Sequence, residues 1–424
     1  MKMMNASPVI EWNRLVIDLM QSITQPSDVD LPRRNTSEAA RVYALLNVAM
    51  HDAMGGLGGD PALEPRWVVQ PAPGLSADLA PFAAIGAGCQ LLEGLFSLPQ
   101  REQQIRDLMR NLRDEHAGAS GVIADITAAL DYGKDVASAL LADQRYAIPT
   151  NDPVEDLHLP ANPPPEGIGR LGFAPGAARY RRLTPFVLAR GDWFHAPPPQ
   201  ELAGFGYARE WHEVYAQGSL ALREAAADSF ESRMARLWRG GVGTSQETGF
   251  WMEIARVISA DPARALTLSE QTRVMTAIAV ANCDAMITSW SSKWTYTFWR
   301  PQDAIRRGDE DGNAATFGDP AWAPYNGSQG ASPEHTSGTA TFAGACSTVL
   351  AHLFGDAVSF EVDFQSATGL IGPQTFDHLA LTADIAVRTR VWNGIYFASA
   401  GEAGLLAGRL VGRRIIDAMA LMPM

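Results

Sequence analysis

The chain has 424 residues, of which 46% are hydrophobic and 19% are charged, a composition typical of a globular protein with a large buried core. Its formal net charge of −13 at pH 7 opposes non-specific binding to nucleic acid and to anionic membranes, because both are negatively charged. We therefore expect neither a nucleic-acid partner nor a membrane partner.

Cysteine and histidine spacing gives no sign of a metal site or a disulfide framework. Cys89, Cys283 and Cys346 lie far apart without a CxxC pattern, and no HxH or HExxH pattern is present. The N-terminal segment lacks the apolar stretch of a secretory signal, and no apolar run reaches the roughly 20 residues of a membrane span. We interpret the chain as cytoplasmic, with three buried thiols and no bound metal.

Helical periodicity dominates the N-terminal half, residues 1–146. Apolar residues recur at helical spacing over 9–23. Ser37 suits the N-cap of a second helix, which Gly55 and Gly56 would end. The same periodicity predicts three further helices, at 83–96, 101–115 and 122–142. Convincing alternation with a period of two is missing, so we expect few strands.

A proline-rich connection follows at 147–200. It contains the runs Pro163-Pro164-Pro165 and Pro197-Pro198-Pro199, which block helix continuation. Its aromatic residues can be buried, which argues against disorder. An irregular segment of this length usually has a function, such as forming the wall of a pocket.

The C-terminal half, residues 201–424, returns to helical patterns. Helices are predicted from about 201 to 308, and a loop follows at 309–313. Further helices are predicted at 340–354 and 379–392, and the final helix carries Gly404, Gly408 and Gly412 at a spacing of four residues. Because charged residues flank these glycines, we expect a face for close helix packing in a soluble fold.

A group of cationic and hydrogen-bonding residues in this half suits an anion. Lys293 and Arg300 are seven residues apart and would share a face if the segment is helical, with Pro301 ending or kinking it. Two cations on one face repel each other unless an anion lies between them. Further donors are expected at a helix start and late in the helix 379–392. We call the following set the anion cradle: Lys293, Arg300, Ser337, the Gly338 amide and Arg390.

Three sequence blocks carry a resemblance to a known family. The chain resembles the vanadium-dependent haloperoxidases, whose signature is Lys, six residues, Arg-Pro; then Pro-Ser-Gly-His; then Ser-Arg, five residues, His, three residues, Asp. The first block here is Lys293 to Pro301. The others read Thr336-Ser337-Gly338-Thr339, and Thr389-Arg390 followed by Tyr396 and Ala400. Similar segments elsewhere are Glu11-Trp12-Asn13, Asn47 to Ala53, Thr184-Pro185-Phe186 and Pro197 to Pro199.

This resemblance implies an all-α fold of two four-helix bundles with long irregular connections and a pocket in the second bundle. It implies that residues 1–424 form a single haloperoxidase-like domain, related to the type 2 phosphatidic acid phosphatase-like superfamily. It also implies a homodimer. The turn at Asn393-Gly394 should direct Tyr396 back toward the cradle.

The chain departs from the family signature where the chemistry lies. Tyr396 replaces the histidine that binds vanadium, Thr339 replaces the acid–base histidine, and Ala400 replaces its aspartate partner. A phenol with an ordinary pKa near 10 is a poor substitute for imidazole. We therefore expect no vanadate cofactor, no halide oxidation and no phosphomonoester hydrolysis, although phosphate or sulfate can still occupy the cradle.

Two residues are candidates for a general base. His335 is the only histidine within the motif blocks, and its alternative role is a hydrogen-bonded structural residue. Tyr396 is the other candidate, if nearby cations lower its pKa. The residues expected to line a substrate pocket, or alternatively to belong to the core, are Trp294, Phe298, Trp299, Thr339, Trp392 and Phe397.

Within the family, the chain resembles the α-hydroxyketone rearrangement enzymes of napyradiomycin-type meroterpenoid biosynthesis. That resemblance implies a non-redox isomerase acting on a small aromatic polyketide–terpenoid substrate, in which a prenyl group migrates on a naphthoquinone-type ring. The cationic residues would polarise a ketone. Two alternatives stay open: a chloroperoxidase or acid phosphatase with an altered site, and a non-catalytic homologue that binds an anionic ligand.

Overall fold

The computed structural model describes residues 6–58, 60–71, 74–117, 122–148, 167–170, 178–330, 332–364 and 371–424. Helices make up 63% of the described residues and strands 3%. The prediction of an all-α fold with few strands is therefore confirmed. Among the described residues, no helix has both the length and the apolar character needed to cross a membrane.

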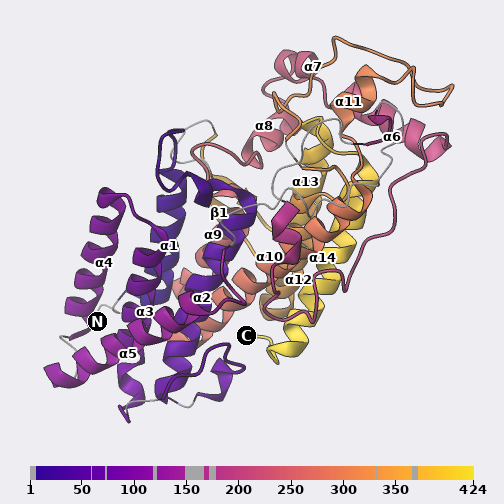
Figure 1. Ribbon diagram of the computed structural model, residues 1–424. Coiled ribbons are helices and arrows are strands. Elements are labelled where there is room, and N and C mark those ends of the chain that lie inside the picture. The colour runs from indigo at the N-terminus through magenta and orange to yellow at the C-terminus, as the bar shows by residue number, and fades with distance from the viewer. Residues whose placement is uncertain are drawn as a thin grey trace.

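The N-terminal half forms a group of helices on one side of the molecule (Figure 1). Its close packing depends on glycine, since a Cβ atom at Gly86 of α3 would lie 2.0 Å from the Leu130 carbonyl oxygen of α5. The helices are α1 (Pro8–Gln21), α2 (Thr36–Gly58), α3 (Ala80–Leu95), α4 (Pro99–Ala117) and α5 (Ile123–Ala142). Short 3-10 turns connect them: η1 (Leu31–Arg34), η2 (Pro61–Leu63) and η3 (Ala77–Leu79).

Two details of α2 differ from the prediction. The helix begins one residue before Ser37, and the Asn35 side chain accepts the Ser37 N–H at 2.9 Å, so Asn35 takes the role predicted for Ser37. The helix also continues through Gly55 and Gly56. A Cβ atom at Gly56 would lie 1.9 Å from the Tyr132 hydroxyl, so this glycine permits close packing and does not end the helix.

The central helix is α10 (Leu268–Tyr296), which packs against both α2 and α12. Most of its residues are buried around the whole circumference, as expected for a helix in the middle of a fold. A capping box between Thr267 and Glu270 fixes its start. One cluster of buried apolar residues extends from Val9 to Leu421 and includes both halves of the chain.

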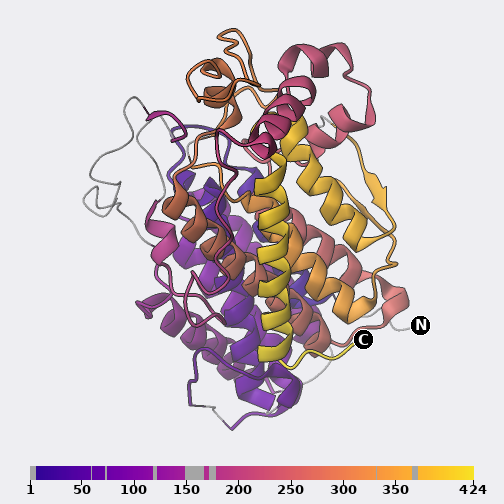
Figure 2. The same ribbon diagram turned by 90° about the vertical axis from the view of Figure 1, so that its right-hand side faces the viewer.

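The C-terminal half surrounds the other side of α10 (Figures 1 and 2). Its helices are α6 (Phe205–Gln217), α7 (Leu220–Ala225), α8 (Phe230–Leu237), α9 (Gln246–Ala260), α11 (Pro301–Arg306), α12 (Gly338–Phe354), α13 (Leu379–Trp392) and α14 (Ala398–Ala418). The 3-10 turns are η6 (Ala178–Arg182) and η7 (Pro262–Arg264). Strands β1 (Phe360–Val362) and β2 (Gln374–Phe376) pair antiparallel, with Phe360 opposite Phe376.

The glycine face of the last helix packs as predicted. Cβ atoms at Gly404, Gly408 and Gly412 of α14 would lie 2.7, 2.1 and 2.6 Å from carbonyl oxygens of Ser337, Thr341 and Ala345. Only glycine allows the two helices to approach this closely. The contact holds the start of α12, and with it part of the anion cradle, in place.

The proline-rich connection is described in part, because residues 149–166 and 171–177 lie outside the described residues. Its described portion is largely irregular and is attached to α10. The Asp284 carboxylate accepts three backbone N–H groups, from Phe186, Val187 and Leu188, at 2.8 to 3.0 Å. The three cysteines are free and buried, as predicted.

Candidate active site

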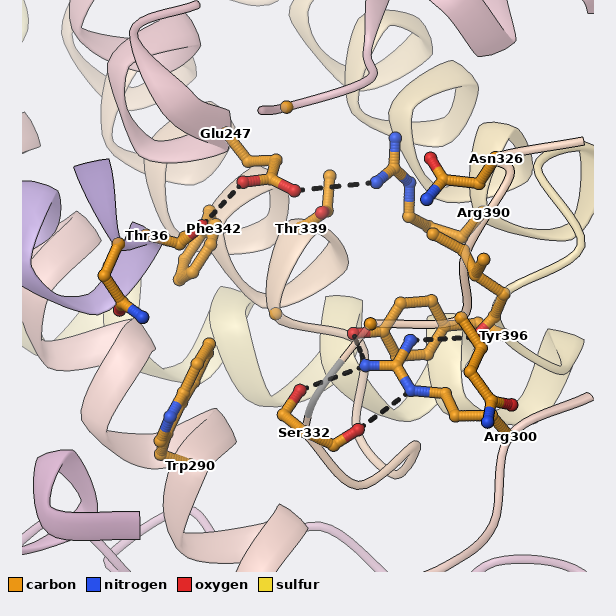
Figure 3. Close-up of a pocket in the computed structure, with 16 residues that line it drawn as sticks. Thr36, Glu247, Trp290, Arg300, Asn326, Ser332, Thr339, Phe342, Arg390 and Tyr396 are labelled. Carbon is orange, nitrogen blue, oxygen red and sulfur yellow. Dashed lines mark hydrogen bonds and ion pairs between the residues drawn. The ribbon is translucent and has the colours of Figure 1, made fainter. Parts of the chain in front are cut away.

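A cavity of about 320 Å³ lies where the start of α2, the first turn of α9, the last turns of α10, the start of α12 and the end of α13 meet. Figure 3 shows its polar side chains gathered at two ends, with Trp290 and Phe342 as aromatic walls. The lining residues are Asn35, Thr36, Gly240, Glu247, Trp290, Arg300, Asn326, Gln329, Gly330, Ser332, Gly338, Thr339, Phe342, Arg390, Ile395 and Tyr396.

At one end of the cavity, the Tyr396 hydroxyl lies between two cations. It accepts hydrogen bonds from Lys293 Nζ at 3.1 Å and from an Arg300 terminal nitrogen at 3.2 Å. Arg300 Cζ also lies 4.2 Å from the centre of the tyrosine ring. Gly394, with φ of 73°, makes the turn after α13 that directs Tyr396 to this position, as the sequence predicted.

Lys293 and Arg300 reach Tyr396 from different elements, and the prediction of one shared helical face is wrong. Helix α10 ends at Tyr296, and Thr297 adopts a left-handed conformation with φ of 49°. Arg300 lies in extended backbone, and Pro301 starts α11. Proline suits a first helical position because its missing N–H is not needed there.

The protein itself satisfies most of the cationic donors. All three N–H groups of Lys293 have acceptors, namely the carbonyls of Pro333 at 2.6 Å and Glu334 at 3.1 Å, and the Tyr396 hydroxyl. Arg300 donates to Tyr396, to the Ile395 carbonyl, and to the carbonyl and hydroxyl of Ser332. These four bonds leave one of the five guanidinium N–H groups.

Burial and charge shift the pKa values of these groups. Burial lowers the pKa of Lys293 to about 8, although the neighbouring Tyr396 opposes that shift. Burial alone would raise the pKa of Tyr396, but the positive charges of Arg300 and Lys293 outweigh it and bring the pKa below its ordinary value of 10. Two buried cations thus favour the phenolate form of Tyr396.

At the other end of the cavity, Arg390 faces Glu247. An Arg390 terminal nitrogen lies 3.8 Å from Glu247 Oε1, and Glu247 Oε2 accepts the Thr36 hydroxyl at 2.9 Å (Figure 3). Arg390 also donates to the carbonyl of Trp238 and, at 3.3 Å, to the Thr389 hydroxyl. This end therefore presents one positive and one negative group to the cavity.

The start of α12 forms a third polar part of the lining. Ser337 is the N-cap, and its hydroxyl accepts the Ala340 N–H at 3.3 Å. Gly338 and Thr339 follow and line the cavity. First-turn amides have no carbonyl partner within their own helix, so they can bind an oxyanion.

His335 occupies a different environment. Its Nε2 lies 2.8 Å from the Pro197 carbonyl oxygen, and its Nδ1 is buried without a hydrogen-bond partner among the described residues. Burial lowers the pKa of His335 to about 4, so the ring is neutral near pH 7. The described cavity lining includes neither His335 nor Ser337 nor Lys293.

The structure brings part of the predicted set together. Arg300, Gly338, Thr339, Arg390 and Tyr396 line the cavity. The aromatic residues predicted to line a pocket are not part of this cavity lining. Phe298, Trp299 and Phe397 pack in a separate buried cluster, and Trp294 and Trp392 are buried in the main core.

Trp290 and Phe342 form the aromatic wall instead. Helical spacing could have identified both, since Trp290 lies one turn before Lys293 and Phe342 one turn after Gly338. Glu247 gave no local signal because α9 is distant from the motif blocks in the sequence.

Vanadate, which the family signature implies, does not fit the residues present. It would need a histidine ligand and unoccupied cationic N–H groups, but the Tyr396 hydroxyl already takes donors from Lys293 and Arg300. Thr339 and Tyr396 stand where the signature has histidine. Among the described residues, no group of three or more His, Cys, Asp or Glu side chains could hold a metal ion.

Comparison with known proteins places this site in a family context. The sequence model of the VCPO second helical-bundle domain matches residues 273–422. The vanadium chloroperoxidase of Curvularia inaequalis is 25% identical over 403 residues, which cover 80% of this chain. The chain spans 64% of the length of that relative.

Solved structures show the same fold. The first bacterial vanadium-dependent iodoperoxidase superposes with a TM-score of 0.73 at 22% identity, covering 99% of this chain and 98% of that one. A holo-type bacterial vanadium-dependent chloroperoxidase gives a TM-score of 0.62 at 16% identity, covering 93% and 94%. The chain therefore has the helical fold of the vanadium haloperoxidases, and the match to the VCPO second helical-bundle domain covers its last third.

Proposed function

We propose that the chain is a non-redox isomerase that catalyses an α-hydroxyketone rearrangement. In this reaction a prenyl group of a naphthoquinone-type meroterpenoid intermediate moves to the neighbouring carbonyl carbon. The observation that carries the proposal is the Tyr396 hydroxyl, which lines a cavity and is held between Lys293 and Arg300 with a lowered pKa.

The reaction needs a base but no oxidant. The Tyr396 phenolate removes the proton of the tertiary alcohol, and the alkoxide oxygen forms a new carbonyl bond. The carbon–carbon bond to the prenyl group breaks and forms again at the adjacent carbonyl carbon. The electron pair of the old carbonyl moves to its oxygen, which takes the proton back from Tyr396. Substrate and product are isomers of equal mass.

Lys293 acts through Tyr396 in this proposal, since it is not among the residues that line the cavity and its three N–H groups are already bonded. The ketone oxygen instead binds at the start of α12. The first-turn amides and the Thr339 hydroxyl are donors there. Donors fixed before the reaction stabilise a developing oxyanion, and one such donor typically changes kcat by about 10²–10³-fold.

Trp290 and Phe342 supply apolar surface to align the aromatic ring. A volume of about 320 Å³ lies at the lower end of the range for small-molecule sites, about 300–1,000 Å³. It suits a bicyclic ring better than a larger polycycle. Tyr396 is a better candidate for the base than His335, whose nitrogens bond the Pro197 carbonyl or are buried.

The test is incubation with a prenylated hydroxynaphthalenone, followed by mass spectrometry and NMR. We expect an isomer of equal mass from the wild-type protein and no conversion by Tyr396→Phe. Tyr215→Phe is the matched control, because that hydroxyl bonds Asp319 away from this cavity. Binding without conversion would indicate a non-catalytic homologue. Monochlorodimedone turnover with vanadate, peroxide and halide would refute the proposal in favour of a haloperoxidase.

A further inference from the structure

Glu247 and Arg390 face each other across a gap that is too long for a direct hydrogen bond. The nearest nitrogen–oxygen distance is 3.8 Å, whereas N–H···O bonds span about 2.7–3.2 Å. Both side chains line the cavity, at the end away from Tyr396 (Figure 3). The gap is thus open to whatever molecule the cavity holds.

Both groups keep unused hydrogen-bonding capacity. A carboxylate can accept about four hydrogen bonds, and Glu247 accepts one short bond, from Thr36 at 2.9 Å, among the described residues. The Arg390 nitrogen that faces Glu247 has no acceptor within hydrogen-bond distance in the described part of the chain. A separation above about 3.5 Å between such groups leaves room for a bridging oxygen atom, such as that of a water molecule or a hydroxyl.

The backbone around Glu247 allows and favours a carboxylate at this position. A Cβ atom at Gly240 would lie 2.5 Å from the Glu247 carboxyl carbon, so glycine makes room for it. Glu247 also lies in the first turn of α9, where the helix dipole favours a negative side chain. The carboxylate is therefore held in one place by Thr36, Gly240 and its own helix.

We propose that Glu247 and Arg390 recognise a hydroxyl group on the aromatic ring of the substrate. The hydroxyl donates its proton to Glu247 and accepts an N–H from Arg390, which a methyl ether or a bare ring carbon cannot do. An anionic substituent would be repelled by Glu247. This assignment names the substrate class more closely, and only the identity of the ring rests on the proposed function.

The experiment measures binding and not turnover, so its result is separate from that of the isomerisation assay. A naphthol and its methyl ether are titrated into the full-length protein by isothermal calorimetry. Because a hydrogen bond to a charged group is broken in the ether, we expect the wild-type protein to bind the naphthol about 10- to 100-fold more tightly. Glu247→Gln should lose most of that preference.

Glu253→Gln is the matched control, since Glu253 lies on the same helix but pairs with Arg256 outside the described cavity lining. It should keep the wild-type preference. Equal affinity of the wild-type protein for the naphthol and the ether would overturn the assignment, as would full preference in Glu247→Gln. A preference that depends on Glu247 in a protein without isomerase activity would leave this site in place and remove only the proposed reaction.

Discussion

Replacing Glu334 by Gln tests the electrostatics behind the anion cradle. The Glu334 carboxylate accepts the Phe397 N–H at 2.7 Å, and its backbone carbonyl accepts Lys293 Nζ. Burial raises the pKa of this carboxyl from an ordinary 4.5 to about 8. Gln keeps the size and the acceptor oxygen but stays neutral at every pH.

Because the pKa of Glu334 is higher in the folded protein than in the unfolded chain, its contribution to stability falls as the pH rises. The folded protein keeps the proton on Glu334 between pH 4.5 and about 8, where the unfolded chain has lost it. The stability from this proton is therefore fully present below pH 4.5 and is lost as the pH rises through about 8. One pKa unit corresponds to about 1.36 kcal/mol. Between pH 5 and 8, the free energy of unfolding of the wild-type protein should therefore fall by about 4 kcal/mol more than that of Glu334→Gln.

Urea denaturation at pH 5, 6, 7 and 8 measures this difference directly. Lys293 titrates in both proteins, so its contribution cancels to first order. Glu402→Gln, at an exposed position of α14, is the matched control and should follow the wild-type curve. If the free energies of unfolding of wild type and Glu334→Gln run parallel across this range, Glu334 is not protonated in the folded protein.

Three further outcomes follow from the same site. The pKa of Tyr396 is below its ordinary value of 10, so kcat/KM should rise with pH as Tyr396 loses its proton. It should fall again above about pH 8, where Lys293 loses its proton. Lys293→Met removes one of the two cations and should move the rising limb to higher pH. Gly338→Val should raise KM, because even a Cβ atom there lies 3.2 Å from Trp290, and Gly338→Ala should have the smaller effect. Tyr396→Ala should release an N–H on both Lys293 and Arg300, so inorganic phosphate should raise its Tm more than that of wild type.

Local periodicity determined much of the fold. Helix α5 and helix α13 lie within a residue of their predicted bounds. Each buries residues at helical spacing, although the buried face of α13 includes polar residues such as Thr382 and Arg390. The predicted helix end was wrong where contacts between distant segments determine how far the helix continues. Gly55 and Gly56 lie inside α2 because α5 and the segment after α2 press against them, and no local pattern reveals such neighbours.

The site shows the same division. The order of the motifs correctly predicted that Arg300, Gly338, Arg390 and Tyr396 line one cavity. Arg300 and Tyr396 follow the ends of α10 and α13, Gly338 starts α12, and Arg390 lies in the last turn of α13. The prediction that aromatic residues after Lys293 line the cavity assumed that the helix continues. The helix ends at Tyr296, and the left-handed Thr297 changes the direction of the chain. Residues after that turn, such as Trp299, enter a different core cluster.

Tyr396 explains physically how Lys293 and Arg300 can be buried together although the histidines of the vanadium haloperoxidase signature are absent. Lys293 and Arg300 are buried, and two buried like charges are costly unless a negative group lies between them. In a vanadate enzyme the bound anion would meet that need. Here the neighbouring group is the Tyr396 hydroxyl, whose phenolate form the two cations favour. The same two positive charges lower the pKa of Tyr396, because they stabilise its negatively charged form. The two charges that could hold an external anion therefore favour the phenolate form of a side chain of the protein itself.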